Sequence, residues 1–113
     1  MFFTAALGTQ FATPQTPAPV SLADELRPAT WAMHVPVAWL AAPVSRVRKG
    51  DQLDILAIRS GDRAYTVPVA YAVGVLSSDD HGLVLEVDEN DASAIATAHG
   101  SGMQLVPLLR SSR

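Results

Sequence analysis

Apolar residues recur at every second position in several stretches of the chain. In residues 31–37 these positions hold Trp31, Met33, Val35 and Val37. This spacing is typical of β-strands that bury one face. The same pattern predicts strands in residues 53–58, 83–88 and 103–109, and it predicts a long β-rich run over residues 64–69 and 71–76 that bends at Pro68.

One helix of several turns is predicted after the strand at residues 83–88. Asp88 is a suitable N-cap, Ile95 and its apolar neighbours recur at helical spacing, and Gly100 is expected to supply a left-handed stop. A single helical turn is predicted where Ser21 precedes Asp24 at the capping-box position. Residues 77–82 are polar and are predicted to form an exposed loop.

A tight turn is predicted before the strand at residues 53–58. Gly50 tolerates a positive φ angle, and Asp51 can accept hydrogen bonds from nearby backbone N–H groups. We expect Gly50, Asp51 and Asp54 to shape this turn, so that a Gly50→Val substitution lowers stability and solubility. A catalytic pair of carboxylates at Asp51 and Asp54 is the less favoured interpretation.

These elements predict a mainly β fold, with a small β-clip or barrel-like sheet of five to six strands and one α-helix in the C-terminal half. The length of 113 residues fits one domain. Residues 1–28 are proline-rich and are expected to be a flexible N-terminal segment or linker, followed by a β-rich domain over residues 29–110. The apolar start is too short for a signal peptide or a membrane span, so no membrane anchor is visible in the sequence.

The charge and the cysteine content exclude several classes of function. The formal net charge is −3 and the isoelectric point is about 5.4, which argues against a nucleic-acid-binding protein. The chain has no cysteine, so disulfides, thiolate metal sites and cysteine nucleophiles are excluded.

Few residues suggest catalysis or metal binding. His34, His81 and His99 fall on a strand, a loop and a helix end, and no pair has the spacing of a helical metal site. Asp88 and the two acids that follow it are better explained as the start of a helix than as a calcium loop. The sequence therefore predicts no catalytic residue, no metal site and no cofactor.

Four aromatic residues are candidates for a surface that binds a partner or a ligand: Trp31, Trp39, Tyr65 and Tyr71. Trp31 and Trp39 flank a short Val-Pro-Val segment and could border a peptide groove. Packing in the core or at its rim is the commoner role of such residues.

Three stretches, taken in order, resemble the RcpC/CpaB family of Flp (Tad) pilus assembly proteins. The first is HVPV at residues 34–37 followed by VRKGDQLDIL at residues 47–56, with Lys49 where the family usually has proline. The second is VGVL at residues 73–76. The third runs from GLVLEVD at residues 82–88 to MQLVPLLR at residues 103–110.

This resemblance implies a non-catalytic structural or assembly module of a Tad-type (type IV) pilus or a related secretion apparatus. It implies a location in the bacterial periplasm or cell envelope, with a cytoplasmic location open if the start of the chain is native. The partners it implies are other pilus-assembly proteins, a secretin above all, and a homo-oligomer is possible; no nucleic-acid partner is expected.

Two other functions remain open from the sequence. A small SAF-like β-clip domain that binds a ligand or carbohydrate would use Trp31, Trp39, Tyr65 and Tyr71 to line one groove. A transcriptional regulator of the swapped-hairpin type would also place a Gly-Asp turn before a strand, but the acidic balance speaks against DNA binding.

Overall fold

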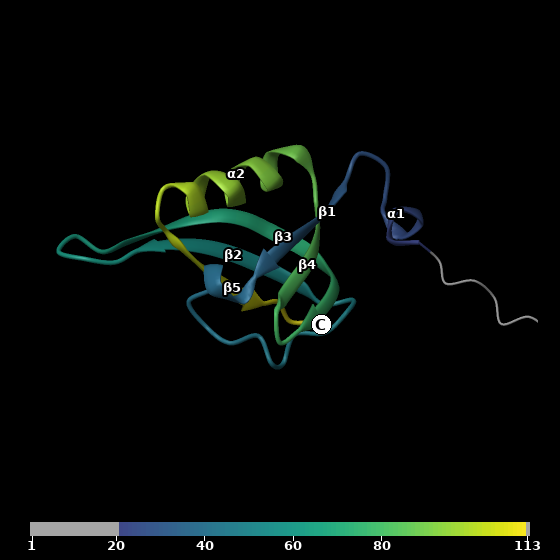
Figure 1. Ribbon diagram of the computed structural model, residues 1–113, viewed down its shortest axis with the longest axis horizontal. Coiled ribbons are helices and arrows are strands. Elements are labelled where there is room, and N and C mark those ends of the chain that lie inside the picture. Colours follow the sequence, from purple (N-terminus) through teal and green to yellow (C-terminus); the bar gives the residue numbers. More distant parts are fainter. Residues whose placement is uncertain (1–20, 113) are drawn as a thin grey trace, which may run out of the picture.

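The computed structural model describes residues 21–112, and the predicted mainly β fold is confirmed. The described residues form five strands and one long helix, α2, arranged as in Figure 1. In chain order the elements are α1 (Leu22–Glu25), β1 (Trp31–Pro36), the 3₁₀ helix η2 (Val37–Trp39), β2 (Gln52–Arg59), β3 (Tyr65–Asp79), β4 (Gly82–Val87), α2 (Glu89–Gly100) and β5 (Gln104–Leu109).

The five strands form one open antiparallel sheet in the order β1-β4-β3-β2-β5. β1 and β5 are therefore its edge strands. The segment that follows β1 and η2 reaches the other edge strand, because Leu40 forms an isolated β-bridge with Leu105 of β5. There the N–H of Ala41 donates to the carbonyl of Leu105 over 2.8 Å. The sheet consequently curves until the segment after β1 touches β5.

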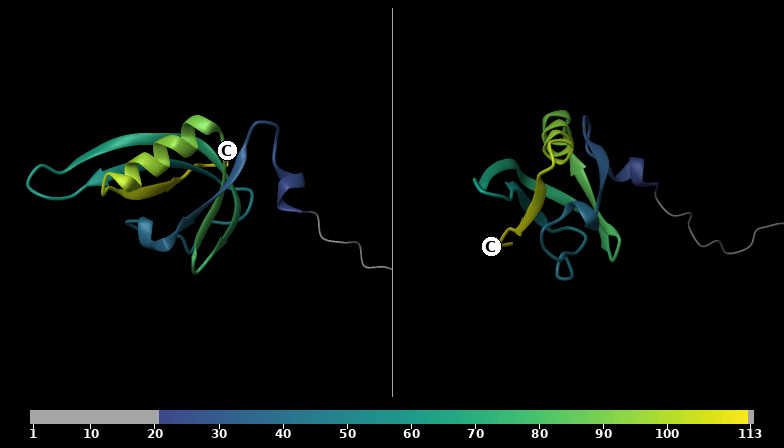
Figure 2. Two further views of the ribbon diagram at one scale, coloured as in Figure 1. Left: turned by 45° about the horizontal axis from the view of Figure 1, so that its top comes forward. Right: turned by 60° about the vertical axis from the view of Figure 1, so that its left-hand side comes forward.

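The core lies between the concave side of this sheet and α2. Figure 2 shows α2 lying along one side of the curved strands. Leu53, Ile55 and Ala57 alternate inward from β2 and are almost fully buried. The remaining fully buried large side chains come from β1, β4, β5 and the helix: Val35, Val87, Leu83, Leu85, Leu105 and Ile95.

β3 is longer than predicted and has three irregularities, two opposite β2 and one opposite β4 between Val75 and Ser77. The long run was expected to bend at Pro68, and one change of register does fall between Pro68 and Ala70. A second falls where Tyr71 and Ala72 lie opposite the single residue Asp54. Ala72 adopts φ +53°, and its N–H donates to the Asp54 carboxylate over 2.9 Å. The bulge thus turns the strand and is held by a side chain of β2.

The prediction of a loop over residues 77–82 is wrong. β3 continues to Asp79 and β4 begins at Gly82, so only Asp80 and His81 form the turn. The Asp79 carboxylate accepts hydrogen bonds from the N–H groups of His81 and Gly82 over 2.7 and 3.2 Å. Polar residues can form a strand here because pairing with β4 satisfies their backbone groups.

The helix predicted after Asp88 is confirmed, but its stop is not Gly100. Asp88 caps α2, its carboxylate accepting the N–H of Asp91 over 2.8 Å. Gly100 is still helical, and Gly102 takes the left-handed conformation at φ +80°. The N–H of Gly102 donates to the carbonyl of His99, and the N–H of Met103 to that of Ala98. This pair of bonds is the Schellman motif, which closes the helix two residues later than predicted.

The expected linker of residues 1–28 lies mostly outside the described residues. Its described part holds α1, capped as predicted by Ser21, whose hydroxyl accepts the N–H of Asp24. Arg27 then contacts β4, because its side chain and backbone both donate to Glu86. At the other end, Arg110 continues the sheet by donating its N–H to the carbonyl of Gln52 over 2.9 Å.

Candidate functional site

The residues expected to shape one turn occupy two places. Gly50 lies in the turn at φ +94°, and the Asp51 carboxylate accepts the N–H of Arg48 over 2.9 Å. Asp54 lies beyond the turn, in β2, where it joins the bulge of β3 to Arg110, the residue after β5. The hydrogen bond from the Ala72 N–H, with a smaller contribution from Arg110, lowers the pKa of Asp54. Asp51 and Asp54 therefore have separate structural partners and do not form a carboxylate pair.

The four aromatic candidates do not line one groove. Trp31, Tyr65 and Tyr71 are exposed, by 52%, 48% and 62%, and each borders a different depression of the surface. Trp39 is half-buried and stacks on His99, with ring centroids 3.8 Å apart. This stacking holds η2 against the C-terminal end of α2. A single aromatic ligand groove is therefore not formed.

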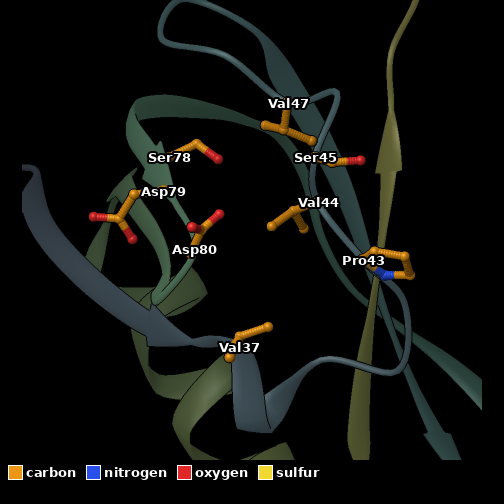
Figure 3. A pocket seen from close by; sticks show the side chains of 8 residues that line it. All are labelled: Val37, Pro43, Val44, Ser45, Val47, Ser78, Asp79 and Asp80. Carbon is orange, nitrogen blue, oxygen red and sulfur yellow. The ribbon is translucent and has the colours of Figure 1, made fainter.

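A first depression lies between the β3–β4 turn and the loop that follows η2. It has a volume of about 360 Å³ and is lined by apolar and polar side chains in equal number, with Asp79 and Asp80 at the turn. Figure 3 shows Val37, Val44 and Asp80 around this space, with Asp79 farther from the loop. Because Asp79 is occupied by the two N–H groups of its own turn, the pair does not present two free carboxylates.

A second depression lies beside Tyr71 and contains several carboxylates. Glu86 accepts the backbone N–H of Arg27 over 2.8 Å, and this bond is the main cause of its lowered pKa. Desolvation, and then the neighbouring Asp88 charge, raise the pKa of Asp91. Glu86 forms an ion pair with Arg27, and Asp88 caps α2. Both carboxylates therefore stabilise the fold of the described chain.

Two further grooves lie beside α2. The first, which we name the arm–helix groove, is lined by Tyr65, Val67 and Val69 of β3 and by Ala94, Thr97 and Met103. Most of its β-side wall belongs to the arm, residues 58–68 of the β2–β3 hairpin, which Figure 1 shows projecting beyond the rest of the sheet. The volume is about 450 Å³.

Arg59 connects the two walls of the arm–helix groove. Its guanidinium donates to the Ser101 carbonyl at the end of α2 over 2.6 Å. The same guanidinium donates to the Tyr65 hydroxyl over 3.1 Å. A cation at a helix C-terminus is favoured by the helix dipole. Since one side chain ties the arm to the helix, the groove is preformed and loses little conformational entropy on binding.

The second groove, which we name the edge–helix groove, lies between edge strand β1 and α2. It is lined by Trp31, Met33 and His34 of β1 and by Glu89, Ala92 and Ala96 of α2, and its volume is about 580 Å³. Glu89 is the only acidic or basic side chain of this lining apart from the imidazole of His34. The small helix residues leave space beside the strand.

Among residues 21–112, no three His, Asp or Glu side chains lie close enough together to hold a metal ion. No helix of this part of the chain has the length and apolar character needed to cross a membrane.

The lining of the arm–helix groove was not identified from the sequence, except for Tyr65. The alternation of Tyr65, Val67 and Val69 after a turn was a usable signal, because these residues share one face of a strand. That this face meets Ala94 and Thr97 depends on the tertiary fold.

Comparisons with protein-family models, with curated proteins and with solved structures found no match.

Proposed function

We propose that this chain is a non-catalytic docking module of a Tad-type (type IV) pilus or a related secretion apparatus in the bacterial cell envelope. The observation that carries the proposal is the arm–helix groove. It exposes Tyr65 and Val67 by 48% and 41% on a projecting hairpin, beside a helix face of small residues. Exposed apolar side chains around a preformed groove are typical of a site that binds another protein.

The resemblance to the RcpC/CpaB family supports the choice of apparatus. Its first stretch covers the end of β1, the Gly50 turn and β2. The other two cover β3 from Val73 and the succession of β4, α2 and β5. The resembling residues therefore include the helix and the core of the sheet that position the arm. A secretin or another pilus-assembly protein is the partner we propose, with an apolar segment that fills the groove.

The arm allows a matched test of this function. Val67→Asp places a charge on the groove side of β3, whereas Thr66→Asp places the same charge on the neighbouring exposed residue, which does not line the groove. We expect Val67→Asp to abolish surface pili, counted by electron microscopy, and to stop co-purification of the secretin. Thr66→Asp should leave both near wild type. Normal piliation of a folded Val67→Asp variant would contradict the proposal.

A further inference from the structure

The outer side of β1 is an unused template for another strand. β1 pairs with β4 without any change of register, from Trp31 opposite Val87 to Pro36 opposite Gly82. Val37 and His81 form the next pair of opposed residues, and the N–H of Val37 donates to the carbonyl of His81. In an antiparallel ladder every second pair is hydrogen-bonded, so Trp31, Met33 and Val35 direct their backbone groups to β4. Ala32, His34 and Pro36 direct theirs outward.

The two edges of the sheet differ in how they are protected. β5 carries Pro107 in its middle, and its Leu105 is already bridged by Leu40. A proline and a covering segment both obstruct the addition of a strand. β1 has its proline only at the last position, and it bears no carboxylate, Lys or Arg. No strand of the described chain pairs with its outer side. The outward N–H and C=O groups of Ala32 and His34 are thus available.

α2 completes a groove along this edge. β4 leads directly into α2, so Glu89 comes two residues after Val87, the partner of Trp31. The stacking of Trp39 on His99 fixes the far end of the helix beside the chain that follows β1. The helix therefore runs alongside the strand in the same direction. An open strand edge flanked by a helix is the geometry that accepts an extended peptide by β-augmentation.

We infer that the edge–helix groove binds an extended peptide segment that pairs antiparallel with β1 and carries an apolar residue two positions before a Lys or Arg. In this pairing the peptide exchanges hydrogen bonds with Ala32 and His34. The apolar side chain falls opposite Met33 and faces the space beside Ala92 and Ala96. The basic side chain falls opposite Trp31, near Glu89.

The requirement for a basic residue follows from charge and from the exposed ring. Glu89 is the one carboxylate of the groove, and it is exposed. Trp31 is 52% exposed, so its face is open to a cation. A positive side chain at this position meets both an opposite charge and an indole ring. A negative side chain there meets like charge and gains neither contact.

The test uses the purified chain and the acetylated, amidated peptide Thr-Thr-Val-Thr-Lys-Thr. Amide hydrogen exchange should slow at Ala32 and His34 on addition of the peptide. It should change little at Met33, whose N–H already faces β4. Replacing the peptide lysine with glutamate should weaken binding by about tenfold, consistent with a surface charge pair and a cation–π contact.

Two variants decide whether the groove itself is responsible. Glu89→Lys should reverse the preference, so that the glutamate peptide binds more tightly than the lysine peptide. Ala32→Pro removes one outward N–H, as Pro36 does naturally, and should abolish protection at His34 while the melting temperature stays near wild type.

Three results would overturn the inference. They are absence of protection at millimolar peptide, equal binding of both peptides to wild type and Glu89→Lys, and protection that appears on raising protein concentration without peptide. The last result would assign the edge to a second copy of the chain. The inference rests on the proposed docking role and adds a second binding site to it. The peptide test uses only the purified chain and concerns the edge–helix groove. The Val67→Asp experiment tests the arm–helix groove, so the two proposals can fail independently.

Discussion

Gly82 lies where a side chain would collide with the backbone of a neighbouring strand. It lies opposite Pro36, with φ +150°. A Cβ atom built on Gly82 meets the carbonyl oxygen of Val35 and lies 2.9 Å from the Cα of Pro36. Both neighbours are backbone atoms, so the clash is relieved only if β1 moves away from β4. We therefore expect Gly82→Ala to destabilise the domain through the pairing of β1.

Gly50 provides the matched control for Gly82→Ala. It also has a positive φ, +94°, but a Cβ built there has no atom within 4 Å. Alanine at either position carries a cost for its positive φ, and each substitution restricts the unfolded chain by the same amount. Gly82→Ala adds an overpacking cost of about 1–3 kcal/mol. The clash alone therefore makes Gly82→Ala about 1–3 kcal/mol more destabilising than Gly50→Ala.

Thermal unfolding followed by circular dichroism measures this difference. At about 4–8 °C per kcal/mol for a domain of this size, Gly82→Ala should melt roughly 5–20 °C below Gly50→Ala. Urea midpoints should rank the variants in the same order. Equal melting temperatures would refute the reasoning, because they would mean that the backbone of β1 does not pass over Gly82.

Three further predictions concern the turn, a carboxylate and the helix. Gly50→Val should melt below Gly50→Ala although the space is open, because a β-branched residue resists positive φ more strongly; equal melting would contradict this. The lowered pKa of Asp54 means that its stabilisation is present above about pH 4 and is lost as pH falls through the folded-state value. The urea midpoints of wild type and Asp54→Asn should therefore differ at pH 7, and the difference should shrink as the pH falls below about 4; a constant difference would exclude this role. Ile95→Ala, at a fully buried site, should cost about 2–5 kcal/mol in urea unfolding, whereas the exposed Thr97→Ala should stay within about 0.5 kcal/mol; similar losses would place Ile95 outside the core.

The strands and the helix were predictable because their signals are local. Alternation identified β1, β2 and β4, and Asp88 marked the start of α2. Local signals were weakest where tertiary pairing decides the backbone. Ala72 at φ +53° has no sequence signature, since its conformation depends on the Asp54 carboxylate. The polar end of β3 looked like a loop because its pairing with β4 is not visible in its composition.

The candidate sites were less predictable than the fold. The sequence singled out aromatic residues, and Trp31, Tyr65 and Tyr71 are indeed exposed, but they border different depressions. A groove depends on which elements lie side by side, and the order β1-β4-β3-β2-β5 follows from long-range pairing. The part played by Arg59, which joins the arm to α2, likewise appears only in three dimensions.

The measurement that tests the docking role most directly is site-specific crosslinking in the native cell envelope. A photoreactive benzoylphenylalanine replaces Val67 in the arm–helix groove, and a control chain carries it at Ser45, an exposed position in the loop after η2. The crosslinked partners are identified by mass spectrometry. The account predicts a secretin or another pilus-assembly protein bound at position 67 and absent at position 45. Recovery of no pilus component at position 67, or the same proteins at both positions, would contradict it.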